Sequence, residues 1–213
     1  PPRPPPFAPP ALFRPPLAEP SRVIPWLGPG AGRIGTVAKG ARRAKSPFRG
    51  KLDLFHLAEF SFRRSRRSEL HTLCEVVLTE SFPNLRTDVD LLDCLARATK
   101  LLTRSTEEQT PLRAEFDLML ELVRRLNGGG AGEFWLSVFE VKFLASQGQE
   151  PDWAKAKLDP GTRAVAAKMA AADWADLARL RPSAVQLRRL AGFLDPFIRH
   201  HVGPIKPLAK RAD

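Results

Sequence analysis

The chain has 213 residues, of which 43% are hydrophobic, so it can bury the core of one large domain or two small ones. No run of 18 apolar residues occurs, which excludes a membrane-spanning helix, and the beginning lacks the apolar stretch of a secretory signal. Cys74 and Cys94 form no CxxC pair and have no histidine at metal-binding spacing. We therefore expect a cytoplasmic protein with free thiols and no zinc site.

The formal net charge of +11 is distributed unevenly along the chain. Residues 1–68 carry +11, residues 69–152 carry −7 and residues 153–213 carry +7. This change of sign indicates two modules and confines the binding of a polyanion to the basic ones. The open alternative is that the basic surfaces reflect composition alone.

The beginning of the chain is dominated by proline. Twelve of the 21 prolines lie in the first 30 residues, and the first residue is Pro instead of Met. Residues 1–10 are predicted to be a polyproline or disordered leader. A misassigned or frameshifted start would also explain the prolines, and both interpretations stay open.

The next part of the chain alternates polar and apolar residues, as β-strands do. A small closed β-barrel is therefore expected over residues 11–80, since closure of short strands removes exposed sheet edges. The prolines limit the first two strands, because proline cannot donate a ladder hydrogen bond. The strands are predicted at residues 11–14, 22–27, 33–38, 52–63 and 70–79.

From residue 88 the apolar residues repeat with a helical period, which predicts an all-α domain over residues 81–213. Thr87 and Ser183 are expected to cap the first and last helices, and Pro196 to kink or split the last one. The predicted fold class is thus α+β, a small β-barrel followed by helices. The helices are predicted at residues 88–102, 110–127, 132–146, 158–172, 173–180 and 184–201, and the third is expected to be central because it is apolar on most sides.

The segment Gly32–Phe55 indicates a surface that binds a polyanion. Its cations would neutralise phosphates, and Phe48 would stack on a base; a hydrophobic plug under the loop is the open alternative for Phe48. The candidate DNA-binding residues are Arg33, Lys39, Arg42, Arg43, Lys45, Phe48, Arg49 and Lys51. Weaker candidate patches are Arg63, Arg64, Arg66 and Arg67, and the helical cluster Arg188, Arg189 and Arg199.

No pattern of catalytic residues accompanies these cations. The sequence has no P-loop, no HExxH and no nucleophile elbow. Asp88, Asp90 and Asp93 are interpreted as first-turn acids that match a helix dipole, not as a metal site. We expect a protein that is not an enzyme and that needs no cofactor and no metal.

Three stretches carry a resemblance to a known family. Gly32–Phe55 is similar to the pattern G-x-[IV]-x-x-[VL]-A-K-G-A-R-x-x-K-S of the bacterial recombination-mediator family RecO. Phe139–Leu144, followed by Gly148 and Pro151, resembles a helix end of that family, and His201–Lys206 resembles its closing segment. The resemblance implies an N-terminal oligonucleotide-binding (OB) barrel and a C-terminal helical domain. It also implies DNA binding, strand annealing, contact with single-stranded DNA-binding protein (SSB), and partnership with RecR in loading the RecA recombinase.

The sequence departs from the family pattern at several places. No four-cysteine zinc module follows the third helix, so zinc is expected to be absent. Ser137 and Val138 stand where the family can carry an arginine that docks an acidic SSB tail. The remaining candidate contacts for that tail are Val141, Lys142 and Leu144.

The leading hypothesis is a non-enzymatic mediator of DNA repair and recombination that holds single- or double-stranded DNA on the basic barrel. The alternative is an RNA-binding or ribosome-associated protein with the same barrel. A third possibility is an interaction scaffold whose basic ends bind acidic proteins. The oligomeric state stays open.

Overall fold

The computed structural model describes residues 21–202, so the predicted leader (1–10) and the predicted strand at 11–14 lie outside the described residues. The described residues form two compact units. Unit 1 contains the residues up to Pro83 together with Thr106–Leu120, and unit 2 contains the rest. Helix α2 (Arg113–Asn127) therefore begins in one unit and ends in the other.

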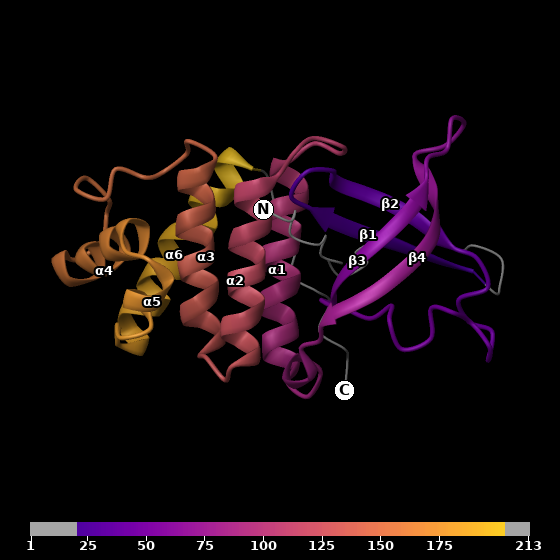
Figure 1. Ribbon diagram of the computed structural model, residues 1–213. Coiled ribbons are helices and arrows are strands. Elements are labelled where there is room, and N and C mark those ends of the chain that lie inside the picture. Colours follow the sequence, from indigo (N-terminus) through magenta and orange to yellow (C-terminus); the bar gives the residue numbers. More distant parts are fainter. Residues whose placement is uncertain (1–20, 203–213) are drawn as a thin grey trace, which may run out of the picture. The chain divides into compact units, whose positions relative to one another are not determined.

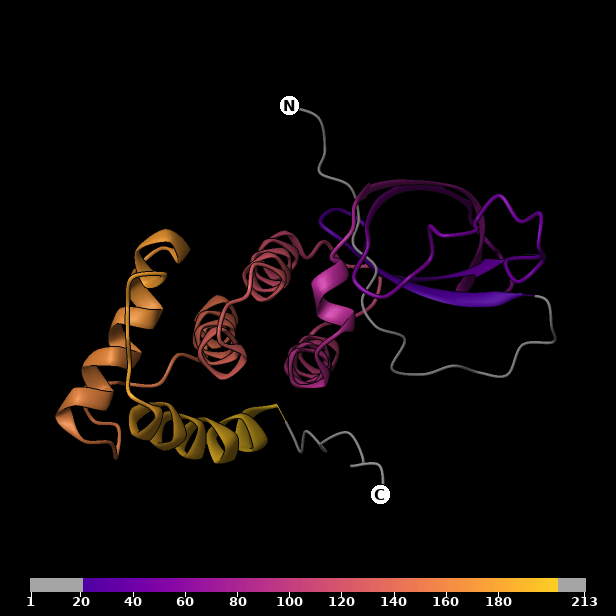
Figure 2. The same ribbon diagram turned by 90° about the horizontal axis from the view of Figure 1, so that it is seen from below.

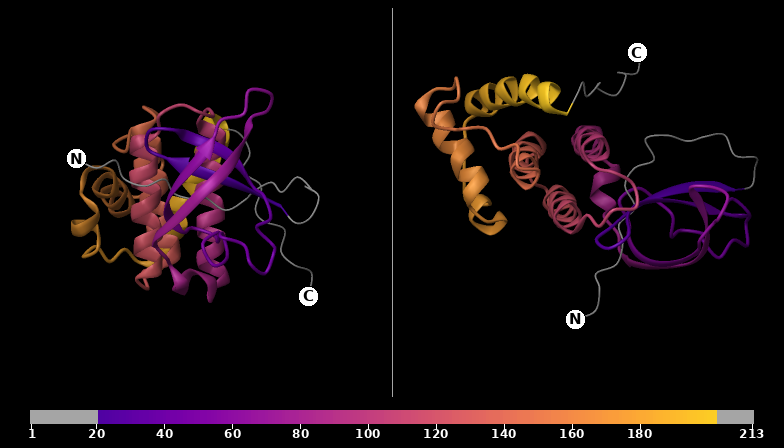
Figure 3. Two further views of the ribbon diagram at one scale, coloured as in Figure 1. Left: turned by 45° about the vertical axis from the view of Figure 1, so that its right-hand side comes forward. Right: turned by 90° about the horizontal axis from the view of Figure 1, so that it is seen from above.

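Unit 1 contains a four-stranded sheet in the order β1-β2-β4-β3 (Figure 1). Its strands are β1 (Arg22–Gly28), β2 (Gly32–Ala38), β3 (Leu57–Arg63) and β4 (Leu70–Glu80). β2 and β4 run parallel, and the other neighbours run antiparallel. The strands curve around a shared interior (Figure 3), but the four described strands form an open sheet with β1 and β3 outermost. The α+β class is confirmed, and the expected closure of the barrel is not made by these strands.

β3 begins five residues later than the alternating pattern predicts. The pattern favours a strand from residue 52, whereas the strand starts at Leu57. Phe55 adopts a φ of 58°, a conformation that no β-ladder accepts, and its ring is buried. Residues 52–56 thus turn the chain instead of extending it.

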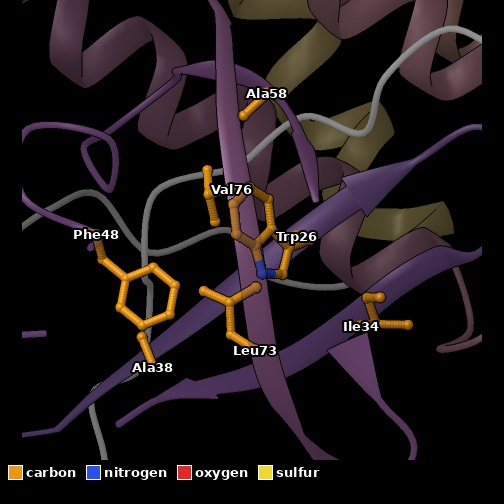
Figure 4. Packing of buried hydrophobic residues seen from close by; sticks show 7 residues of the cluster. All are labelled: Trp26, Ile34, Ala38, Phe48, Ala58, Leu73 and Val76. Atoms are coloured by element: carbon orange, nitrogen blue, oxygen red, sulfur yellow. The ribbon is translucent and has the colours of Figure 1, made fainter. Parts of the chain in front are cut away.

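The core of unit 1 draws apolar side chains from every strand (Figure 4). The ring of Trp26 stacks on Phe60 with centroids 4.0 Å apart. Its indole N–H donates to the hydroxyl of Thr36 at 2.8 Å, so the one polar atom of the buried ring has an acceptor. The buried members of this cluster are Trp26, Ile34, Ala38, Phe48, Ala58, Leu73 and Val76.

A later segment of the chain completes unit 1. The N–H of Gln109 donates to the carbonyl of Arg33 at 3.1 Å, and the Arg33 guanidinium donates to the carbonyl of Thr106 at 2.8 Å. A Cβ at Gly32 would lie 1.9 Å from the carbonyl oxygen of Thr110, and Gly32 has a φ of 67°. Only glycine fits this close backbone approach.

Unit 2 is helical, with α3 at its centre. α3 packs against α1, α4 and α6 and is buried on most sides, which confirms its expected place. α6 continues unbroken through Pro196, so the predicted split is wrong. No helix within residues 21–202 combines the length and apolar character that crossing a bilayer requires. The remaining helices are η1 (Pro83–Arg86), α1 (Val89–Ser105), α3 (Gly132–Ser146), α4 (Pro160–Ala171), α5 (Trp174–Leu177) and α6 (Ala184–His201).

Side-chain caps fix where these helices begin. Asp88, not Thr87, accepts from the N–H groups of Asp90 and Leu91 at the start of α1. A carboxylate also interacts favourably with the helix dipole, which explains the acid at this position. Ser183 caps α6 as expected, in a capping box with Gln186.

One arginine joins three helices of unit 2. Arg97 on α1 donates to Glu140 on α3 at 2.5 Å and to Asp195 on α6. Burial alone would lower the pKa of the Arg97 guanidinium, but attraction to the two carboxylates outweighs it and raises that pKa. Burial raises the pKa of the Glu140 carboxyl, while Arg97 acts in the opposite direction. The pair thus keeps a buried acid in the core.

The bond between Trp26 and Thr36 predicts a measurable loss of stability. Thr36→Val leaves the indole N–H buried without an acceptor and should cost about 1–3 kcal/mol of unfolding free energy. Urea unfolding followed by circular dichroism measures it. Thr36→Ser keeps the hydroxyl and should lose less; equal losses in the two variants would show that the hydrogen bond contributes nothing.

Loss of the Arg97 bridge should make the cost in unfolding free energy depend on pH. Arg97→Met leaves Glu140 buried without its cation and should cost about 3 kcal/mol at pH 7, the lower end of the usual range because Arg97 is 31% exposed. The folded pKa of Glu140 then lies further above the unfolded value near 4.5. The lost stability should therefore return as the pH falls toward that value.

Urea midpoints between pH 7 and pH 4.5 measure this recovery. The control Arg97→Met/Glu140→Leu removes the acid as well, so the recovery should vanish. Parallel pH profiles for Arg97→Met and the wild type would contradict the assignment.

Candidate nucleic-acid interface

The connection from β2 to β3 is an ordered series of turns. The N–H of Arg43 donates to the carbonyl of Gly40 at 3.0 Å, and the N–H of Lys51 donates to the carbonyl of Phe48 at 3.1 Å. Gly40 and Gly50 adopt positive φ values of 69° and 73°, which glycine accepts without strain. We call residues 39–51 the cationic loop.

Phe48 anchors this loop. Its side chain is 6% exposed and packs in the core of unit 1, where Ala41 and Leu52 lie against the same cluster. The predicted stacking of Phe48 on a base is therefore wrong, and the alternative of a hydrophobic plug is correct. The side chains of Lys39, Arg42, Arg43, Lys45 and Arg49 are exposed around this anchor, and Lys51 is half-buried.

Arg22 is a cation that the sequence reasoning missed. In the register of β1 with β2, Arg22 lies opposite Ala38, next to the first residue of the cationic loop. Its guanidinium donates to the carbonyl of Leu52 at 3.3 Å, so it lies at the base of the loop. The tight turn at residues 29–31 is a signal from which this pairing could be predicted. The prolines near β1 weaken the prediction of that strand.

Arg33 does not belong to this cluster. It lies five residues before Ala38 on β2, which corresponds to about 16 Å along an extended strand. Burial lowers the pKa of its guanidinium, with Glu108 acting in the opposite direction. Because Arg33 is held by the segment around Thr106, its predicted role in binding DNA is corrected to a structural one.

The predicted second patch is divided, with Arg64 toward the Arg33 end of β2 and Arg63 level with the other end of that strand. The guanidinium of Arg64 donates to the side chain of Gln109 at 3.2 Å, and Gln109 in turn bonds to Arg33. The register pairs Arg63 with Thr72 on β4. Arg66 and Arg67 are exposed in the turn that follows. Arg64 is thus separate from the cationic loop, whereas Arg63 lies level with Val37, close to the start of the loop.

Two of the three predicted contacts for a protein tail lie in the interior of unit 2, and the third, Lys142, is half-buried. Val141 and Leu144 are fully buried, so the prediction is wrong for both. The ammonium group of Lys142 donates to the carbonyls of Ala170 and Ala172 at 3.4 and 2.6 Å. Burial lowers its pKa and Asp173 partly offsets this shift. Lys142 thus stabilises the C-terminal end of α4, where a cation is favourable.

The titratable groups form no other site in the described residues. Among residues 21–202, no three histidine, cysteine or acidic side chains gather closely enough to hold a metal ion. Cys74 and Cys94 are free thiols. Burial, together with nearby acids such as Glu133, raises the pKa of the Cys94 thiol to about 11.

Comparison with known proteins identifies the family. The family model "Recombination protein O N terminal" matches residues 12–82, and "Recombination protein O C terminal" matches residues 86–156. The chain belongs to the recombination protein O family. The resemblance seen in the sequence is therefore confirmed.

The relatives of this recombination protein O family member are bacterial proteins named DNA repair protein RecO. The chain is 31% identical to that of Bacillus pumilus over 134 residues, which is 63% of this chain and 52% of the relative. It is 30% identical to that of a Roseiflexus species over 133 residues, 62% of this chain and 46% of the relative. The chain thus spans about half the length of the curated relatives it matches.

The buried position of Phe48 predicts how stability and nucleic-acid affinity respond to substitution. Phe48→Leu keeps an apolar plug, so it should cost less than about 1.5 kcal/mol and leave affinity within about twofold. Phe48→Ala should cost about 3–5 kcal/mol, because it leaves a cavity. Urea unfolding and fluorescence anisotropy with labelled single-stranded DNA measure both quantities. A Phe48→Leu variant that is stable but binds single-stranded DNA poorly would support the stacking of Phe48 on a base after all.

Proposed function

We propose that this recombination protein O family member is a mediator of DNA repair and homologous recombination that binds DNA through the cationic loop. The supporting observation is the anchored loop itself. Its five exposed cations project from a segment whose backbone is fixed by turns and by the buried ring of Phe48. Arg22 adds a cation at the base of the loop. No step of this function needs covalent chemistry.

The affinity would come from neutralisation of phosphates and release of their counterions. Because Phe48 lies in the core, base stacking contributes little at this loop, and binding should depend weakly on sequence. Single- and double-stranded DNA both present the required phosphates. Annealing of two complementary strands would follow, since the same cations screen both backbones.

Family membership supports further steps of the proposal. We infer that the protein acts in the cytoplasm with RecR and SSB to load the recombinase onto single-stranded DNA. Because Val141 and Leu144 lie in the core, they are not assigned to the SSB tail. The named DNA repair relatives support this role over RNA binding, which becomes an outcome of the tests below.

Charge reversal on the loop tests the proposal. Arg42→Glu/Arg43→Glu/Lys45→Glu should weaken binding of single-stranded DNA by at least about tenfold at low salt and flatten the dependence of affinity on salt. Fluorescence anisotropy at several salt concentrations measures both effects. Unchanged affinity, or wild-type affinity that does not vary with salt, would contradict the proposal.

A matched control separates the loop from net charge. Arg113→Glu/Lys168→Glu/Arg179→Glu changes net charge by the same amount at three exposed positions outside the loop. It should bind within about threefold of the wild type if the loop is the site. Competition between labelled DNA and structured RNA compares the two affinities. Stronger binding of RNA than of DNA would favour the RNA-binding alternative.

A further inference from the structure

A pocket of about 570 Å³ in unit 2 is lined by the segment that leads into α4 and by the middle of α6. Helices α4 and α6 pack against each other (Figure 2). The volume of the pocket is in the range of sites that hold small organic molecules. The family models end at residue 156, so the pocket lies outside the matched stretch. Its lining includes Lys157, Leu158, Asp159, Arg189, Gly192 and Phe193.

Gly192 leaves the α6 side of the pocket open. A Cβ built at this residue would meet no atom within 4 Å, so no neighbouring side chain occupies the space above it. Pro196, which also lines the pocket, has no N–H and cannot close the usual helical bond to the carbonyl of Gly192. The pocket therefore has an open surface on its α6 side.

Phe193 provides an aromatic wall whose orientation is fixed. It packs between Trp153 and Phe197 with centroid distances of 6.1 and 6.0 Å, and Phe197 stacks on His201 at 4.1 Å. Phe193 is only half-buried. Nucleobases stack on aromatic faces of this kind. Of the aromatic rings on α6, Phe193 is the one that lines the pocket.

The charges at the rim are suited to phosphate. Asp159 caps α4 through the N–H of Thr162, and it holds the guanidinium of Arg189 at 2.9 Å. Hydrogen bonds from Thr162 and the cation of Arg189 keep the pKa of the Asp159 carboxyl well below its usual range. Lys157, which also lines the pocket, is exposed. The rim thus carries two cations and one acid.

We propose that this pocket binds a nucleotide unit of single-stranded DNA, with the base against Phe193 and the phosphate at Lys157 and Arg189. The choice of DNA as the ligand rests on the proposed function. The pocket is formed by residues of unit 2 and the cationic loop belongs to unit 1, so either proposal can be contradicted without the other. The pocket gives Arg189, one member of the predicted cluster Arg188, Arg189 and Arg199, a defined role in contacting the strand.

Photo-crosslinking with an oligothymidine that carries 5-iodouracil tests the site in the full chain. Trypsin releases residues 190–199 as one peptide, and mass spectrometry should find the crosslink there. Gly192→Leu fills the open space with a strong helix former, so it should fold and lower the crosslink yield about tenfold. The control Ala167→Leu places the same side chain on an exposed position of α4 and should leave the yield unchanged.

The outcomes distinguish the two proposals. A crosslink at 190–199 that persists in the charge-reversed loop variant at higher protein concentration supports the pocket. Crosslinks confined to peptides of the cationic loop overturn the pocket and leave the proposed function intact. An absence of both binding and crosslinks overturns both proposals.

A competition arm identifies the source of the nucleotide. Thymidine monophosphate, at the nucleotide concentration of an unlabelled oligothymidine competitor, should leave the crosslink at 190–199 in place, whereas the oligomer should remove it. If the mononucleotide removes the crosslink and the oligomer does not, the occupant is a free nucleotide. That result overturns the assignment of the pocket to a DNA strand.

Discussion

The insertion of the Phe48 ring into the core of unit 1 is the contact on which the candidate DNA surface depends. A loop with this many like charges would repel itself in an open conformation, because no core of its own holds it together. One buried aromatic ring ties the middle of the loop to the sheet, and short turns fix the backbone on both sides of it. The cations can therefore be exposed without disorder, and an ordered loop has less entropy to lose in the proposed binding of a strand.

In unit 2, charged side chains hold the helices together instead of forming an exposed surface. In the stretch Phe139–Leu144, Glu140 pairs with Arg97 and Lys142 bonds to the end of α4, while the apolar residues fill the core. A buried ion pair adds little net stability over an apolar replacement, but it tolerates few alternative packings. These charges thus specify the arrangement of α1, α3, α4 and α6.

Much of the architecture was predictable, because strand and helix periods and caps are local properties of the sequence. The strands near residues 22–38, the central α3 and the capped α6 all follow from such patterns. The wrong predictions concern residues whose role depends on whether they lie in the core or at the surface. Phe48 and Val141 have patterns that fit either a surface or a core, and only packing separates the two. Arg33 was misplaced because the segment that holds it lies more than 70 residues away in the sequence.

That distant segment also has a consequence for how the protein is made. The strands of unit 1 leave the ribosome before the residues that bond to Arg33 and lie against Gly32. Helix α1 must be synthesised in between, and it belongs to the other unit. During synthesis, the sheet therefore lacks the segment that bonds to Arg33 until the intervening helix α1 has been made. Biogenesis of the two units is interleaved in time, and neither can be finished as a separate, uninterrupted piece of polypeptide.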